Sequence, residues 1–271
     1  MKVFLGIVGA EMRKQYKNYF HSKFVYFSLF LWPMITFVNG YYQFKPFDFS
    51  AVSKTIPYLN EKSLLSFVLI GYMAMIFFRT LVQSAWRFSM ERTAGTLELV
   101  YLSPASRLAI VLGNCLSALV NSVWLFLVFM VGIQLTYSEV IIQSPFWFTM
   151  AFIMMIVMSV LWGMLLNGLF IFTRDSSFLF TILEEPMEIF AGVKVPVSIM
   201  PLWAQFIAGF FPLTYAIKTL RMFMFEQVNV SEIFRIFGIM TLVCITMFIL
   251  TLLILHYGEK YNRKTGHLAL F

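Results

Sequence analysis

Three glutamates close together in an apolar stretch are the residues of this chain most suited to chemistry. Glu184 and Glu188, four residues apart, fall on one face of a helix, and Glu185 lies between them. A carboxylate inside a membrane is costly, so such residues suggest a functional role. We expect either a cavity-facing acidic site for a cationic or hydroxyl-rich substrate, or a structural cluster paired with Arg79 or Lys194.

No other group of residues in the chain predicts catalysis or metal binding. The histidines lie near the ends of apolar runs or in the tail, and none has a glutamate at metal-ligand spacing: His21, His256 and His267. The Gly-x4-Gly-Lys-Ser/Thr phosphate loop does not occur in the sequence, so we do not expect the chain to hydrolyse a nucleotide by itself. We therefore expect a protein that is not an enzyme on its own, with no metal and no cofactor in this chain.

The composition predicts a membrane protein. Only 12% of the 271 residues are charged and 60% are hydrophobic, whereas a soluble domain carries about 25% charged residues. Apolar runs of about 20 residues recur, each long enough to cross a bilayer as a helix whose backbone groups are satisfied internally. We predict an all-α integral membrane protein with a single domain, residues 1–271, and six transmembrane helices. The predicted spans are residues 24–42, 63–86, 108–135, 146–173, 178–195 and 233–257.

The residues before the first predicted span, 3–22, predict an amphipathic helix that lies on the membrane. Its basic residues lie away from its apolar stripe, as in interfacial helices. The stripe consists of Leu5, Val8, Met12, Tyr16 and Tyr19, and the basic residues are Arg13, Lys14 and Lys17.

Residues 197–226, before the last span, are apolar but too broken for an ordinary span. Pro212 separates two half-length apolar segments, Val197–Phe211 and Leu213–Phe225. Backbone of this kind is tolerated in a membrane where protein or a water-filled cavity shields it. We predict a re-entrant helical hairpin.

Positive charge is distributed unequally between the two sides of the predicted membrane domain. Of the 20 Lys and Arg residues, twelve fall on the side that contains both termini and seven on the other, with Arg79 inside a span. Basic residues favour the cytoplasmic side, so we predict that both termini are cytoplasmic. The same topology explains the net charge of +7 without a nucleic-acid partner. Arg79, within two turns of the cytoplasmic end of its span, is expected to reach the surface.

A polar segment, Glu91–Ser106, lies between the second and third predicted spans. Glu91 and Glu98 flank Gly95-Thr96, and Ser103-Pro104 ends the helix-compatible stretch. A polar helix does not lie in lipid, and the predicted topology places this one in the cytoplasm. Its composition allows either an ordinary loop or a surface that another protein binds.

Two motifs in the chain carry a family resemblance. The first is Glu-x3-Gly-Thr-Leu-Glu-x5-Pro, which begins at Glu91 between the second and third spans. The second follows the fifth span and comprises Ala191–Pro196, Met200–Trp203, Phe211–Ala216 and Leu220-Arg221. Together they resemble the ABC type-2 permease family, the transmembrane subunits of type V ABC transporters, and the resemblance covers nearly the whole chain.

The resemblance implies the membrane subunit of an exporter that works as a dimer with a separate ABC ATPase subunit. ATP and Mg²⁺ would bind to that ATPase, and the second permease subunit would be identical or related. Residues 91–104 would be the coupling helix that docks on the ATPase, and residues 3–22 would be the connecting helix. The coupling residues would be Glu91, Gly95, Thr96, Leu97, Glu98 and Pro104.

The implied substrate is hydrophobic or amphipathic: a drug, peptide, lipid or glycolipid moved outward across a bacterial inner (plasma) membrane. Its candidate path contains Arg79 and the glutamates Glu184, Glu185 and Glu188, which depart from the more uniformly apolar pattern of the family. The same glutamates leave two other functions open, a membrane enzyme acting on lipid and an ion-coupled secondary transporter. The enzyme lacks a His, Asp or Ser partner at similar depth, and a secondary transporter would usually show two related halves.

Overall fold

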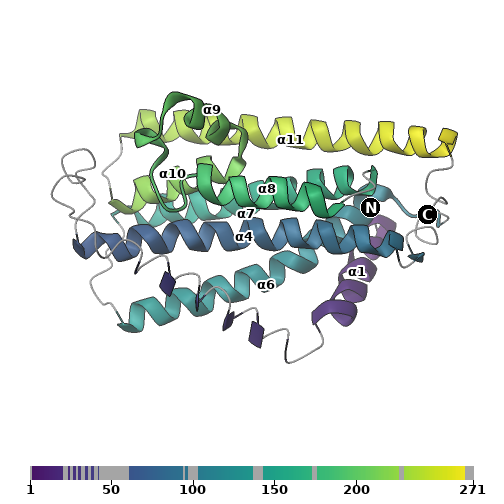
Figure 1. Ribbon diagram of the computed structural model, residues 1–271, viewed down its shortest axis with the longest axis horizontal. Helices are drawn as coiled ribbons and strands as arrows, with labels where there is room; N and C mark the ends of the chain where they lie inside the picture. Colours follow the sequence, from purple (N-terminus) through teal and green to yellow (C-terminus); the bar gives the residue numbers. More distant parts are fainter. Residues whose placement is uncertain are drawn as a thin grey trace.

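The computed structural model describes residues 2–20, 61–93, 95–96, 103–136, 143–172, 176–225 and 229–265, together with scattered positions between 24 and 42. These residues form helices and connecting turns, and none of them is in a β-strand. Figure 1 shows long helices that run side by side, with the shorter α1 crossing one end of the bundle. The predicted all-α class is confirmed for the described part of the chain.

The helices follow the apolar runs of the sequence. The long helices are α4 (Glu61–Thr93), α6 (Arg107–Thr136), α7 (Pro145–Phe172) and α11 (Val230–Thr265). The shorter helices are α1 (Lys2–Gln15), which continues as a π-helical turn (Tyr16–Phe20), α8 (Ser176–Phe190), α9 (Leu202–Phe210) and α10 (Pro212–Phe225).

Four helices are long and apolar enough to cross a membrane, and they coincide with four of the predicted spans. The apolar stretches are Ser66–Phe88, Arg107–Leu127, Pro145–Phe170 and Val230–Gly258. Within the predicted span 24–42, the structure describes only scattered positions and no continuous helix. The arrangement of six spans therefore stays a prediction.

The predicted span 178–195 ends earlier in the structure. α8 stops at Phe190, and the residues that follow, 191–195, form a turn. Gly192 in this turn has a φ of +87°, a left-handed conformation that commonly ends helices and that glycine adopts without steric cost. Apolar composition alone does not reveal this end, because the turn residues are themselves mostly apolar.

Two short helices occupy the region of the predicted hairpin. A 3₁₀ turn (Val197–Ile199) precedes α9, and α10 begins at Pro212 after a single extended residue, Phe211. Proline suits the first position of a helix, where its missing N–H has no intrahelical partner. The path of this pair through a membrane stays a prediction.

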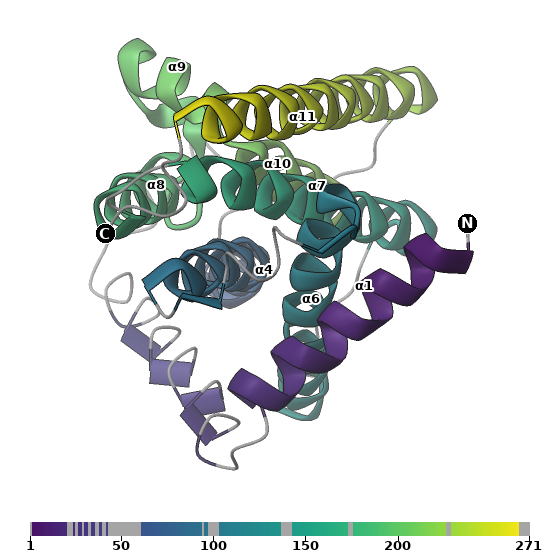
Figure 2. The same ribbon diagram turned by 90° about the vertical axis from the view of Figure 1, so that its right-hand side faces the viewer.

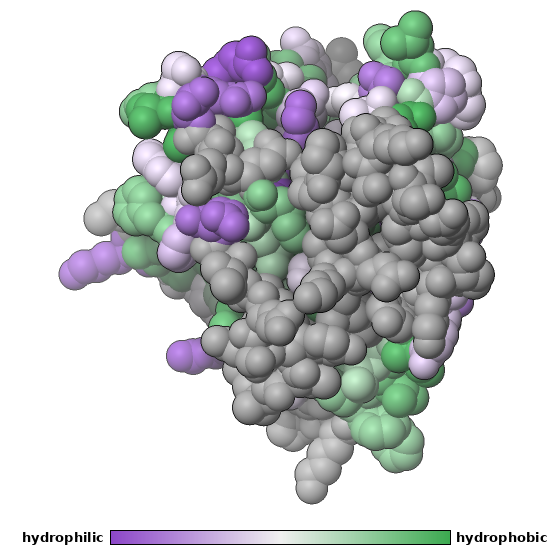
Figure 3. Space-filling view, turned by 90° about the vertical axis from the view of Figure 1, so that its left-hand side faces the viewer, coloured by the Kyte–Doolittle hydropathy of each residue, from purple (hydrophilic) through white to green (hydrophobic). Residues whose placement is uncertain are grey.

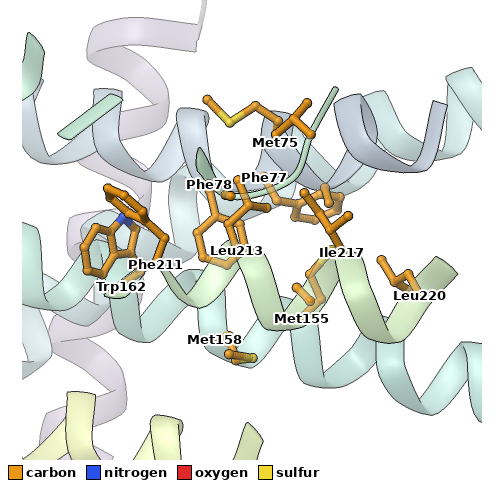
Figure 4. Close-up of a cluster of buried hydrophobic side chains, with 14 of the residues drawn as sticks. Met75, Phe77, Phe78, Met155, Met158, Trp162, Phe211, Leu213, Ile217 and Leu220 are labelled. Carbon is orange, nitrogen blue, oxygen red and sulfur yellow. The ribbon is translucent and has the colours of Figure 1, made fainter. Parts of the chain in front are cut away.

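The core of the bundle lies where α4, α7 and α10 meet. Phe78 of α4, Met158 of α7 and Leu213 of α10 are buried together in this region (Figure 4). At its edge the rings of Trp162 and Phe211 meet edge to face, with centroids 6.3 Å apart. These contacts fix α10, the second helix of the hairpin region, against the two central helices.

Burial distinguishes the central helix from the peripheral one. In the most apolar part of α4, 83% of the residues are buried, whereas in α11 only 28% are. Figure 2 shows α11 along one edge of the bundle and α4 between α6 and α8. Figure 3 looks onto the end where α4 and α11 begin, and both hydrophilic and hydrophobic side chains reach that surface. A long apolar helix so little covered by protein is suited to contact lipid.

α1 packs closely against α6. At Gly113 of α6, a Cβ atom would lie 2.8 Å from Glu11 Cβ and 2.9 Å from Val8 O of α1. The predicted apolar stripe is divided, because Val8 is buried whereas Leu5 is 61% exposed. The buried face also includes Glu11 and Gln15, which the predicted stripe did not contain.

Candidate functional site

Two of the three candidate glutamates are paired with basic residues around the contact between α4 and α8. A carboxylate oxygen of Glu184 lies beside Nε of Arg79, and these side chains are 7% and 27% exposed. One helical turn further on, Glu188 Oε1 lies 3.1 Å from Nζ of Lys194, in the turn after α8. We call Arg79, Glu184, Glu188 and Lys194 the acidic seam.

The ion pairs of the acidic seam offset charges that would otherwise be costly. Burying a carboxylate without a cationic or hydrogen-bonding partner costs several kcal/mol or more, so a pair is the usual arrangement in apolar surroundings. Arg79 therefore contacts Glu184 instead of extending alone to the surface. The seam links α8 to α4 by charge in addition to apolar packing.

Glu185 occupies a different face of α8 from the other two glutamates. Its neighbours along this face, Thr181, Ile182 and Ile189, are exposed as well. A carboxylate there is compatible with water, a protein partner or a polar substrate, but not with acyl chains alone. The three glutamates are close in the sequence, but the fold places them in different environments.

The predicted coupling helix, residues 91–104, begins within α4. Glu91 lies in the last turn of α4, which ends at Thr93, and Gly95 adopts a left-handed φ of +69°. Thr96 Oγ1 donates a hydrogen bond to Glu91 O (3.1 Å), which satisfies a carbonyl at the helix end. A single helix over 91–104 is therefore wrong at its start. Leu97 and Glu98 lie outside the described residues, and Pro104 is exposed just before α6.

Glu91 contacts α1 instead of solvent. It is 7% exposed, and its Oε2 accepts a hydrogen bond from Lys14 Nζ (3.0 Å), while its Oε1 accepts one from Gln15 Nε2 (2.9 Å). Glu11 Oε1 accepts from Gln15 Nε2 (2.8 Å) and lies 2.8 Å from Lys14 Nζ. We call Glu11, Lys14, Gln15 and Glu91 the α1 junction. It connects α1 to the end of α4, where the predicted coupling segment begins.

The charges of the α1 junction favour a protonated Lys14. Partial burial acts to lower the pKa of Lys14, but hydrogen bonds and charge attraction from Glu11 and Glu91 outweigh burial, so its pKa lies above the ordinary lysine value. Sequence reasoning missed Glu11 and Gln15. Their spacing of four residues placed them on one face of the helix, but nothing local indicated the buried carboxylate on α4.

The motif residues and the regions around them agree with one known family. The sequence model of the ABC-2 type transporter family matches residues 7–225, a range that runs from α1 to the end of α10. The chain belongs to the ABC-2 type transporter family. It is thus a membrane-embedded permease of an ABC transporter, which confirms the predicted family. A comparison with curated proteins finds no match.

A polar pair inside the permease bundle was not predicted from the sequence. Asn114 Nδ2 of α6 donates to Asn167 Oδ1 of α7 (2.8 Å) and to Ser84 O of α4 (3.3 Å). Asn167 Nδ2 in turn donates to Gly163 O (2.8 Å). Asparagine within an apolar span commonly bridges helices, so two such residues were an available signal. The pair joins α4, α6 and α7 of this ABC-2 permease.

Proposed function

We propose that this ABC-2 permease exports a hydrophobic or amphipathic substrate, powered by ATP hydrolysis on a separate ABC ATPase subunit. The substrate class comprises drugs, peptides, lipids and glycolipids. The working unit contains a second permease subunit, identical or related, and ATP and Mg²⁺ bind to the ATPase. The complex lies in a bacterial inner (plasma) membrane with both termini of this chain in the cytoplasm.

The overlap of the last turn of α4 with the start of the coupling motif carries this proposal. α4 is the most buried of the four span-length helices, and its last turn contains Glu91, the first residue of the coupling motif. A force applied to the segment would therefore reach the core through one continuous helix. Such a device responds to a partner if the partner's two nucleotide states bind the segment differently.

The experiment reverses the charge of Glu98, a coupling-motif residue, and uses a matched exposed glutamate as control. Glu98→Arg is expected to leave the protein in the membrane while ATP hydrolysis no longer drives export. Glu232→Arg makes the same change at the beginning of α11, where the side chain is 47% exposed, and is expected to export normally. Normal export by the Glu98 variant would contradict the coupling role. The wild-type permease is also expected to copurify with a phosphate-loop ATPase.

Within the candidate substrate path, we assign the substrate-facing role to Glu185 and a supporting role to the acidic seam. Glu185 is exposed, whereas Glu184 and Glu188 are ion-paired. Glu185→Gln is expected to reduce export of cationic substrates more than of neutral ones, because only the charge is removed. Equal export of both classes by this variant and the wild type would exclude the assignment. The paired state of Glu184 and Glu188 also gives no support to a membrane enzyme or an ion-coupled transporter.

A further inference from the structure

A buried arginine joins three elements that lie far apart in the sequence. Arg221 of α10 is 5% exposed, and its Nη1 donates a hydrogen bond to Gly192 O (2.6 Å). Its Nη2 donates to Val193 O (2.7 Å) and to Phe67 O (3.1 Å). These carbonyls belong to the turn after α8 and to α4. One guanidinium group therefore connects α10, α4 and the end of α8.

Two glycines make the close approach around Arg221 possible. At Gly71 of α4, a Cβ atom would collide with Val193 O and would lie 2.7 Å from Arg221 Nη2. At Gly192, φ is +87° and a Cβ atom would lie 3.0 Å from Val197 Cγ2. A larger residue at Gly71 would move the turn away from α4, and a larger residue at Gly192 would strain the turn itself. We call Phe67, Gly71, Gly192, Val193 and Arg221 the arginine clasp.

The chemistry of the arginine clasp favours a fixed geometry. The guanidinium carbon lies 3.5 Å from the centroid of the Phe67 ring, a cation–π arrangement that restricts the plane of the group. Its hydrogen-bond acceptors among the described residues are main-chain carbonyls, which cannot change rotamer as a carboxylate side chain can. A planar fork of donors matches several acceptors at once, which the single ammonium of lysine does not.

We infer that Arg221 is a positioning residue for transport, because the clasp makes α4, the turn after α8 and α10 move as one rigid body. A displacement of Glu91 is then transmitted to the hairpin region, because the joined elements do not move relative to one another. This inference rests on the proposed function, since it describes how the coupling motion crosses the permease. It also gives a role to Arg221, a residue of the second family motif to which the sequence analysis assigned no function.

The test measures a distance along the rigid body in the complete transporter. Spin labels on cysteines introduced at the exposed positions Met90, near the end of α4, and Ser198, after the turn, report it by pulsed electron resonance. In the wild type, we expect one narrow distance distribution that is unchanged by nucleotide. In Arg221→Met, the distribution broadens and export falls by about tenfold or more, as expected for loss of a coupling free energy, while ATP hydrolysis continues. Arg221→Lys is expected to give a distribution width and an export rate between those of the wild type and Arg221→Met.

The matched control is Lys218→Met, which removes an exposed cation one turn earlier on α10 and is expected to change neither readout. A narrow, wild-type distribution in Arg221→Met, or a nucleotide-dependent shift in the wild type, would overturn the inference. The distance measured without nucleotide does not depend on the ATPase. If Arg221→Met broadens the distance distribution but the wild type shows no ATP-driven export, the proposed function alone is refuted.

If Arg221→Met does not fold, a pair of glycine substitutions supplies the same comparison. Gly71→Ala displaces Val193 O and is expected to broaden the distribution. Gly238→Ala, on α11 with no atom within 4 Å of the added Cβ, is expected to leave it narrow. Equal distributions in these two variants would also overturn the role of the clasp.

Discussion

At the residue scale, the α8 glutamates show how one sequence cluster divides into different environments. Glu184 contacts Arg79 and Glu188 contacts Lys194, whereas Glu185 is exposed. Removing one partner of a buried ion pair is more damaging than replacing both, because it leaves an uncompensated charge. This asymmetry makes the acidic seam testable independently of transport.

Glu184→Ala is expected to destabilise the protein by roughly 2–4 kcal/mol, near the lower end of the range for breaking a buried pair because Arg79 keeps some solvent contact. The double variant Arg79→Met/Glu184→Leu is expected to recover most of that loss. Thermal unfolding in detergent measures both effects. Glu185→Ala is the control and should change stability little. Equal losses for Glu184→Ala and Glu185→Ala would contradict a structural seam.

At the element scale, α1 is held to the bundle by a close helix contact and by a charged network. The contact passes over Gly113 of α6, and the network is the α1 junction with Glu91. α1 therefore lies against the same helices that flank the coupling segment. A docked α1 can follow that segment only while both attachments are intact.

Gly113→Ala is expected to destabilise the protein by about 1–3 kcal/mol, because the added Cβ would overlap Glu11 Cβ and Val8 O. Gly6→Ala is the control within α1, where no atom lies within 4 Å of the added Cβ. It should be neutral or stabilise the helix by roughly 0.5–1 kcal/mol. Chemical or thermal unfolding compares the two. A stable Gly113→Ala variant would show that α1 packs less closely than described.

Lys14→Met is expected to cost about 1–3 kcal/mol, because Glu11 and Glu91 each lose a charge-assisted partner. The folded-state pKa of Lys14 is raised, so its contribution is complete below the unfolded lysine pKa and is lost as pH rises through the folded value. Stability measured from neutral to strongly alkaline pH should therefore fall more in the wild type than in Lys14→Met. Lys17→Met, which removes an exposed lysine one turn on, should retain the wild-type pH profile.

At the scale of the whole molecule, the helices of the bundle begin and end at two opposite ends. α6 begins toward the end of the bundle where α4 ends, and α7 begins at the other end (Figure 1). Ser106 immediately precedes α6, and Gln143 lies two residues before α7. The amide nitrogens of Gln143 and Ser144 donate to the last carbonyls of α10, Met224 O and Phe223 O (3.4 and 3.2 Å). The two residues before α7 thus cap α10, a helix of the predicted hairpin region.

Cysteines at Ser106 and Gln143, both exposed, test the proposed orientation. A membrane-impermeant maleimide should label Gln143→Cys in intact cells and Ser106→Cys only after permeabilisation, because the side richer in Lys and Arg is expected in the cytoplasm. The buried Cys115 and Cys244 should react in neither condition, which the unsubstituted protein checks. The reverse labelling pattern would invert the topology.

Periodicity and composition were sufficient for the long helices and insufficient for their ends. The apolar runs around Phe78, Cys115, Met158 and Cys244 all became helices near the predicted bounds. The early end of α8 at Gly192 was missed because left-handed glycine carries no hydropathy signal. In the candidate site, spacing placed Glu184 and Glu188 on one face, but spacing could not choose their partners.

The sequence by itself determined the membrane environment of this protein, its helical class and its family, because these depend on composition, local periodicity and short motifs. Only the tertiary structure decided that Glu91 binds α1, that Glu185 alone among the three glutamates is exposed, and that Arg221 joins three elements. The physical reason is that each of these facts is a contact between residues distant in the chain. Such contacts depend on burial and main-chain geometry, and neither can be read from the neighbouring residues in the sequence.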